Sequence, residues 1–182
     1  MCIRDRNKGG FARRAGLFKE IMILNPNTLI FDAGDIFQGT PYFNFFQGDL
    51  ELSLMKKMGY NAATIGNHEF DAGLKTLKQN IINNDFQFIS SNYDFTNTEL
   101  EGLIDKYKIY NKAGVKIGVF GLGIELNGLV NPLLYNETKY YDPVDIAKDM
   151  TSKLKFEEKC DLVICISHLG HQYQIDKISD TK

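Results

Sequence analysis

The sequence predicts one α/β domain in which mixed sheets are flanked by helices on both faces. Short β-rich runs alternate along the chain with segments whose apolar residues recur at helical spacing. The chain has 182 residues, 43% of them apolar, which is enough to bury the core of one ordinary domain. We find no internal repeat and no low-complexity linker, so residues 9–182 are expected to belong to a single domain.

The expected helices follow from apolar residues repeated every three or four positions, the period of one helix face. The first runs from about 11 to 24 and is stopped by the Asn-Pro-Asn sequence at 25–27. The last begins at Asp142, a carboxylate in the N-cap position that is followed by Pro143. The four apolar stripes are Phe11, Ala15, Phe18 and Met22; Leu50, Leu54 and Met58; Leu74, Leu77 and Ile81; and Ile146, Met150 and Leu154.

The expected strands are short runs rich in apolar and β-branched residues, bounded by turn residues. Two of them are joined by a four-residue segment that contains Gly114, which predicts a β-hairpin. Residues 127–141 have no clear periodicity and are expected to form a surface loop. The runs lie at 28–31, 61–65, 86–90, 104–110, 115–122 and 162–166.

Composition excludes several classes of protein. A formal net charge of -2 with 24% charged residues argues against a partner that is a nucleic acid polymer and against a polybasic membrane protein. No apolar stretch approaches the roughly 18 residues of a membrane segment. Residues 1–8 are charged and have no apolar core, so they predict no signal peptide and are expected to be a non-native or disordered leader. Cys160 and Cys165 are expected to be buried or half-buried thiols.

Polar clusters follow three of the expected strands. They are the Asp-Ala-Gly-Asp sequence at 32–35, the Gly-Asn-His-Glu sequence at 66–69, and Ser-His at 167–168. Ligands of open α/β sheets bind beyond the carboxyl ends of the strands, so side chains from these clusters could meet. The candidates are a carboxylate, an amide and imidazoles, a mixture that suits zinc, manganese or iron better than calcium. They are Asp35, Asn67, His68 and His168.

Glycine precedes two of these candidates. Gly34 stands directly before Asp35, and Gly66 stands directly before Asn67. Because glycine has no Cβ, we expect it to let the backbone turn sharply off each strand, so that the following side chain projects toward the ligand.

The same clusters resemble the metal motifs of the calcineurin-like metallophosphoesterases, in the branch of 5'-nucleotidases and UDP-sugar hydrolases. Gly-Asp-Ile-Phe-Gln-Gly-Thr-Pro at 34–41 resembles the second motif, and Gly-Asn-His-Glu-Phe-Asp at 66–71 resembles the third. Ser-His-Leu-Gly at 167–170 resembles the fourth, and Gly-Gly-Phe-Ala-Arg at 9–13 resembles the start of the first helix. The resemblance covers the chain from about Gly9 to its end and implies the N-terminal catalytic domain of such a protein.

The resemblance implies a role for each matching residue around two divalent metal ions, Zn, Mn or Fe. Asp35 would bridge both ions, while Asn67 and His168 would bind one of them. His68 would not be a ligand but would stabilise or protonate the phosphoryl group, and Asp71 would orient His68. Two such ions generate hydroxide from water near neutral pH, and a carboxylate-paired imidazolium can stabilise developing negative charge.

Each of these residues also has a plainer interpretation. Asp35 could cap a turn, Asn67 could be a turn residue, and His168 could be a satisfied histidine at a strand end. His68 and Asp71 could form a simple surface hydrogen bond.

Three further features are interpreted as structural. His171 is expected to be solvated, and Asp32 to be a turn carboxylate or a support for the ligands. The aromatic cluster beyond the second motif is expected to pack in the core or against a domain. Its members are Phe43, Phe45 and Phe46.

Two motifs of the family have no counterpart here. An Asp-x-His motif should precede Gly9, and a Gly-His-x-His motif should follow Lys182, so we expect a layered metallophosphoesterase-like fold truncated at both ends. The first strand of the sheet would be missing, which would expose an edge. A two-metal centre needs roughly six or seven protein ligands, and three are present, so the chain alone is expected to bind metal weakly and hydrolyse little.

The leading hypothesis is metal-dependent hydrolysis of a small phosphate ester, a nucleoside monophosphate cleaved to nucleoside and phosphate. By resemblance, a C-terminal nucleotide-binding domain is missing here, and the place of action is the periplasm or the cell surface. The alternative is a non-catalytic metal- or ligand-binding module on the same fold. A Rossmann-type nucleotide-binding domain ranks low, because no Gly-rich turn with the required spacing opens a helix after the first strand.

Overall fold

The computed structural model describes residues 9–39, 41–170, 172–174 and 177–178. Its helices are α1 (Phe11–Leu24), α2 (Pro41–Phe46), α3 (Asp49–Met58), α4 (Gly73–Asn84), α5 (Pro132–Tyr135) and α6 (Pro143–Ser152). A 3-10 turn, η1, spans His68–Phe70, and a π-helical turn, η2, spans Lys153–Glu157. The strands are β1 (Phe31–Asp32), β2 (Ala62–Ala63), β3 (Tyr93–Asp94), β4 (Tyr107–Lys112), β5 (Val115–Leu122), β6 (Lys139–Tyr140), β7 (Leu162–Ser167), β8 (Gln172–Gln174) and β9 (Lys177–Ile178).

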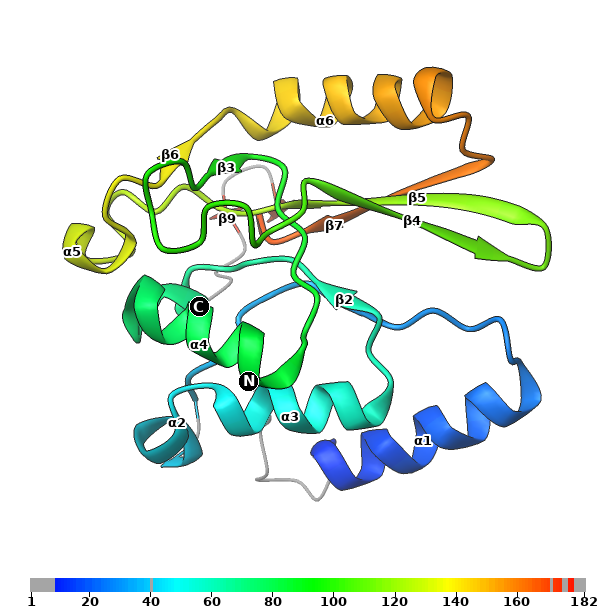
Figure 1. The fold of residues 1–182 in the computed structure, drawn as a ribbon, viewed down its shortest axis with the longest axis horizontal. Helices are drawn as coiled ribbons and strands as arrows, with labels where there is room; N and C mark the ends of the chain where they lie inside the picture. Colours follow the sequence, from blue (N-terminus) through cyan, green and yellow to red (C-terminus); the bar gives the residue numbers. More distant parts are fainter. Residues whose placement is uncertain (1–8, 40, 171, 175–176, 179–182) are drawn as a thin grey trace.

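The elements stack in four layers, helix, sheet, sheet and helix (Figure 1). Helix α6 covers one face of the sheet β4-β5-β7, in which β4 is antiparallel and β7 parallel to β5. The parallel pair β1-β2 lies beneath that sheet, and α1, α3 and α4 lie beneath the pair. This arrangement confirms the expected α/β fold with sheets flanked by helices.

Apolar side chains fill each of the three spaces between the layers. Phe120, Met150 and Leu154 pack between the upper sheet and α6. Ala62 and Val119 belong to the cluster between the two sheets. The largest cluster lies between β2 and the lower helices, with Phe37, Leu52, Met55, Ile65, Phe70, Leu74, Leu77 and Phe88 among its most buried members.

The helices predicted from periodicity are confirmed as α1, α3, α4 and α6. Helix α3 ends at Gly59, whose φ of +88° is a left-handed conformation that glycine adopts without strain. The carboxylate of Asp142 accepts hydrogen bonds from the N–H groups of Val144 at 2.8 Å and Asp145 at 3.1 Å, which caps α6 as expected.

Two predictions of secondary structure are wrong in part. Residues 86–90 form no continuous strand, because their pairing is limited to isolated bridges from Phe88 to Ala63 and from Ile89 to Asp105. The expected loop at 127–141 contains α5 and β6. Asn131 caps α5 through its side chain, and β6 forms only by pairing with β3, which lies far away in the sequence.

The predicted burial of the aromatic cluster and of the cysteines holds only in part. Phe43 is buried in the core as expected, but Phe45 is 80% exposed and Phe46 is exposed as well, both on the short, unpredicted helix α2. Core packing is therefore wrong for Phe45 and Phe46, while packing against another domain stays a prediction. Cys160 is buried as expected, whereas Cys165 is exposed on β7, which is one of the two edge strands of its described sheet.

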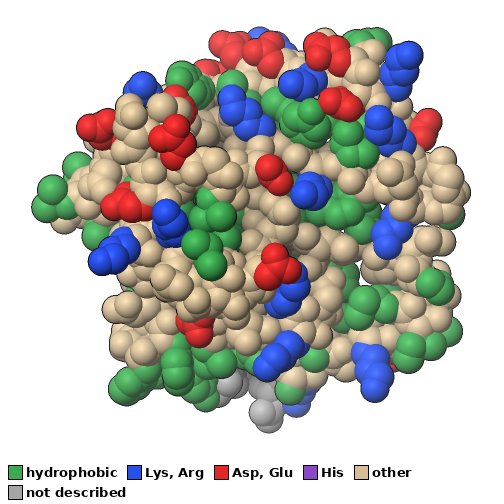
Figure 2. Space-filling view, viewed as in Figure 1, with side chains coloured by type: hydrophobic (Ala, Val, Ile, Leu, Met, Phe, Trp, Pro, Cys, Tyr) green, Lys and Arg blue, Asp and Glu red, His purple; other side chains and the backbone are tan. Residues whose placement is uncertain are grey.

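The visible face of the molecule mixes charges of both signs (Figure 2). Lysine and arginine side chains are interspersed with aspartate and glutamate, and apolar side chains gather at the lower left, over α2. Across the described ranges, no helix combines the length and the apolar character that crossing a bilayer requires. His171 and residues 1–8, for which we predicted a solvated side chain and a leader, lie outside the described residues.

Candidate metal centre

The turn after β1 presents Asp35. Asp32 accepts a hydrogen bond from the Gly34 N–H at 3.1 Å, which confirms Asp32 as a turn carboxylate, and burial raises its pKa. Gly34 has φ +92° and Asp35 itself has φ +56°. Such left-handed conformations are uncommon outside glycine, so the chain around Asp35 has to hold this turn in place.

The turn after β2, residues 66–71, lies directly against Asp35. The N–H of His68 donates to Asp35 Oδ1 at 3.0 Å. A Cβ added at Gly66 would overlap the same oxygen, and a Cβ at Gly34 would lie 2.7 Å from the Gly66 nitrogen. The expected reason for glycine therefore holds at Gly34, whereas Gly66, which has no positive φ, is required by close approach of the two turns.

His168 reaches the same carboxylate from the end of β7. Its Nδ1 lies 2.8 Å from the carbonyl oxygen of Ala33, which can only accept, so Nδ1 carries a proton. Its Nε2 lies 3.3 Å from Asp35 Oδ2. Burial raises the pKa of Asp35, but His168 and the His68 N–H outweigh it and hold that pKa below its usual value. Burial lowers the pKa of His168, and Asp35 reverses this, so that the net shift is upward.

His68 and Asp71 form a second pair on the 66–71 turn. His68 Nδ1 lies 2.7 Å from Asp71 Oδ2, and the two side chains are 40% and 21% exposed. The partly exposed imidazole can therefore meet a ligand while the carboxylate fixes its orientation.

Asn67 stands between two anchored residues of this turn. The N–H of Gly66 is bound by Glu69, and the N–H of His68 is bound by Asp35. The half-buried Asn67 side chain makes no capping hydrogen bond to η1, so its interpretation as a turn residue is not supported by a cap.

Glu69 is the residue of the site to which sequence reasoning gave no role. Its fully buried carboxylate accepts hydrogen bonds from the N–H groups of Asp35 at 2.9 Å, Gly66 at 2.6 Å, Ile36 at 2.6 Å and Phe37 at 3.4 Å. Burial raises the pKa of Glu69 to about 7, and the N–H donors act in the opposite direction. The only sequence signal for Glu69 was its position as a charged residue between His68 and an aromatic residue. Three of its four hydrogen-bond donors lie in the turn after β1, so the local sequence did not reveal them.

The side chains at this point fit a divalent ion. Nε2 of His168 is buried without a hydrogen bond, and because Nδ1 holds the proton, Nε2 presents its lone pair beside Asp35. A histidine that ligates a metal characteristically donates its other N–H to a carbonyl or carboxylate in this way. Among the described residues, no group of three or more His, Cys, Asp or Glu side chains could hold a metal, so Asp35 and His168 do not form a complete metal site by themselves.

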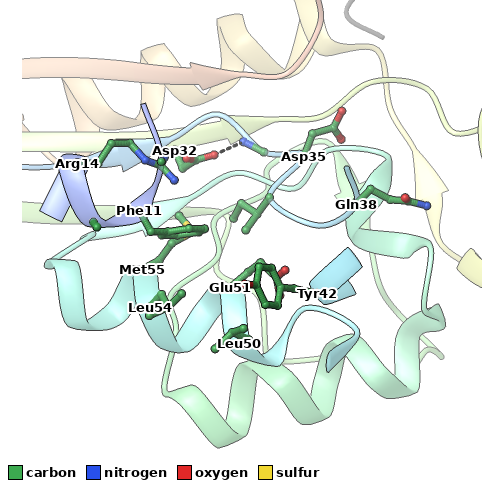
Figure 3. Close-up of a pocket in the computed structure, with 14 residues that line it drawn as sticks. Phe11, Arg14, Asp32, Asp35, Gln38, Tyr42, Leu50, Glu51, Leu54 and Met55 are labelled. Atoms are coloured by element: carbon green, nitrogen blue, oxygen red, sulfur yellow. Dashed lines mark hydrogen bonds between the residues drawn. The ribbon is translucent and has the colours of Figure 1, made fainter. Parts of the chain in front are cut away.

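A cavity of about 450 Å³ opens next to Asp35, between α1, α3 and the turn after β1 (Figure 3). Asp32 and Asp35 lie on its upper side in this view, and Glu51 and Tyr42 lie below. Glu51 is only 6% exposed, and burial raises its pKa. The candidate centre therefore borders a space large enough for part of a small molecule.

The fold is layered and brings a carboxylate and imidazoles together at the ends of its strands. This arrangement is typical of α/β enzymes whose chemistry takes place at that edge of the sheet. The chain belongs to the calcineurin-like phosphoesterase family, since a sequence model of that family matches residues 7–181. Enzymes of this family are hydrolases and are generally dinuclear metal enzymes.

Relatives of known name agree with this assignment. The chain is 34% identical over 146 residues to a 5'-nucleotidase of Vibrio cholerae, covering 80% of this chain and 26% of that protein. It is 36% identical over 151 residues to a snake venom 5'-nucleotidase of Crotalus adamanteus, covering 80% and 25%. The chain thus spans about a quarter of the length of these relatives.

Solved structures give the same result for the fold. A 5'-nucleotidase precursor from Thermus thermophilus superimposes with a TM-score of 0.80 at 32% identity, covering 89% of this chain and 32% of that one. The NAD nucleotidase of Haemophilus influenzae gives a TM-score of 0.78 at 28% identity, covering 89% and 29%.

Proposed function

We propose that the protein to which this chain belongs hydrolyses small phosphate esters, and that nucleoside monophosphates are its substrates. The observation that carries this proposal is the contact between Asp35 and His168, with the protonated Nδ1 on Ala33 and Nε2 beside the carboxylate. The names of the relatives, 5'-nucleotidases and a NAD nucleotidase, support nucleotides as the substrate class.

Asp35, Asn67 and His168 are the proposed metal ligands, with Asp35 as the bridging carboxylate. Two divalent ions, Zn, Mn or Fe, would polarise the phosphoryl oxygens and lower the pKa of bound water toward neutrality. These three side chains supply too few donors for two ions, so we propose that the 182-residue chain alone binds metal weakly and turns over slowly.

His68 and Asp71 are the proposed catalytic pair. His68 would donate a hydrogen bond or a proton to the phosphoryl group through Nε2, since its Nδ1 is engaged by Asp71. The Asp71 carboxylate would keep the ring oriented toward the phosphate as negative charge develops there.

Phosphate release from AMP tests this function. We expect release with manganese or zinc and none with a chelator, and a larger rate when residues flanking the chain in its coding sequence are restored. Asp35→Ala should abolish the metal-dependent rate, because the carboxylate facing both His168 and the His68 N–H is lost. An unchanged rate would show that Asp35 is not a metal ligand.

A non-catalytic metal-binding module remains the alternative, and the flanking coding sequence discriminates between the two. Absence of both Asp-x-His and Gly-His-x-His from that sequence would favour the binding module. For the place of action we propose the periplasm or the cell surface. The Crotalus relative, which is by its name a venom protein, supports this proposal.

A further inference from the structure

Glu69 joins the two turns of the candidate centre. One carboxylate oxygen, Oε2, accepts the N–H groups of Gly66 at 2.6 Å and Asp35 at 2.9 Å. The other, Oε1, accepts those of Ile36 at 2.6 Å and Phe37 at 3.4 Å. One side chain on the turn after β2 therefore organises the main chain of the turn after β1.

These contacts suit a carboxyl group at this position, whose two oxygens each face a pair of N–H groups. The four N–H groups lie where the chain leaves β1 and β2, and a buried main-chain donor without a partner destabilises the fold. A carboxylate accepts at both oxygens, whereas an amide of the same shape turns an NH₂ group toward one pair of donors. Glu69 is fully buried, so water cannot take its place.

The four hydrogen bonds that Glu69 accepts form a clamp, and this clamp holds one residue in a strained backbone conformation. Asp35 has φ +56°, a conformation that persists only where its surroundings enforce it. The hydrogen bond from the Asp35 N–H to Glu69 fixes that conformation, and the Asp35 carboxylate then lies between the His68 N–H and His168 Nε2. Because Glu69 also holds Gly66, it fixes Asn67 relative to Asp35.

We propose that Glu69 is a positioning residue that sets the distance between Asp35 and Asn67 and thereby the affinity for a divalent ion. Glu69 does not touch the ion or the substrate and acts through main-chain N–H groups of both turns. This inference rests on the proposed function, since it takes Asp35, Asn67 and His168 as the ligands.

The test compares Mn²⁺ binding by the chain and by Glu69→Gln. Mn²⁺ broadens NMR signals of nearby nuclei even when it binds weakly, and isothermal titration gives the dissociation constant. We expect Glu69→Gln to raise that constant by about 10–100-fold, the usual effect of changing a residue that holds metal ligands. Circular dichroism identifies conditions in which the variant is folded, and sucrose can be added to favour the folded state.

Asn92→Ala is the matched control. Asn92 is fully buried and also joins two main-chain segments, donating to the Gly123 carbonyl at 2.8 Å and accepting from the Gly123 N–H at 2.8 Å. Its loss should lower the melting temperature and leave the dissociation constant for Mn²⁺ unchanged. A weaker affinity in Asn92→Ala equal to that in Glu69→Gln would mean that general destabilisation explains both, which overturns the inference.

The remaining outcomes separate the two proposals. If Glu69→Gln is folded and binds Mn²⁺ as the unchanged chain does, the positioning role is wrong and the metal site stands. If the unchanged chain shows no Mn²⁺ broadening near Asp35, the metal site and the positioning role fail together. Hydrogen exchange needs no variant: Gly66 and Ile36 amides that exchange as fast as Gly102, in an exposed turn, would show that the clamp does not form.

Discussion

The end of β7 and the 66–71 turn each present a histidine, but they hold it differently. Nδ1 of His168 meets the carbonyl of Ala33, while Nδ1 of His68 meets the carboxylate of Asp71. A carbonyl partner keeps a proton on Nδ1, so that in the neutral ring the lone pair on Nε2 is available to a metal. A carboxylate partner fixes the orientation of the ring, which suits a donor to a phosphate.

The two histidine side chains also differ in how far they are exposed to solvent. The His168 side chain is 12% exposed and its Nε2 is buried beside Asp35, whereas the His68 side chain is 40% exposed. The same residue type thus has two proposed chemical roles, which are set by the partner of Nδ1 and by access to solvent.

The largest expected effect is on turnover and comes from substitutions in the His68 region alone. In whichever form of the protein is active on AMP, His68→Gln should lower turnover by about 10²–10⁴-fold, the usual contribution of a general acid. Asp71→Asn should lower it in the same direction, because the ring loses its carboxylate partner. Affinity for Mn²⁺, measured by titration, should stay the same in both variants, and a large loss of affinity would make His68 a ligand instead.

The second expected effect concerns the His168 region. His168→Ala should weaken Mn²⁺ binding by at least about 100-fold, since a direct ligand contributes more than a residue that supports ligands. Isothermal titration of His168→Ala beside His68→Gln measures the contrast. Equal affinities in the two variants would remove the distinction between the two histidines.

The smallest effects test how tightly the 66–71 turn fits against Asp35. Gly66→Ala should destabilise the fold by about 1–3 kcal/mol, because the new Cβ overlaps Asp35 Oδ1. Gly16→Ala is the control, since a Cβ in the middle of α1 meets no atom and should stabilise by about 0.4–1 kcal/mol. Urea unfolding measures both, and a neutral Gly66→Ala would show that the two turns can separate.

Much of the fold could be predicted from local patterns. The apolar residues that predicted α1, α3, α4 and α6 recur with the period of 3.6 residues that one helix face requires. Asp142 followed by Pro143 marks a helix start, because a carboxylate caps the first N–H groups of a helix. The strand at 86–90 and the loop at 127–141 were predicted less well. Pairing between distant segments decides both, as β6 with β3 shows.

The sequence by itself determined which residues are proposed to carry chemistry, because a carboxylate, an amide and imidazoles each follow a strand in a recognisable string. Only the tertiary structure decided how they are held: that His168 Nδ1 is bound by Ala33, that Gly66 must lack a Cβ, and that Glu69 accepts N–H groups from another turn. The physical reason is that these are contacts between segments distant in sequence. Their geometry depends on how the layers pack and on no local preference of the chain.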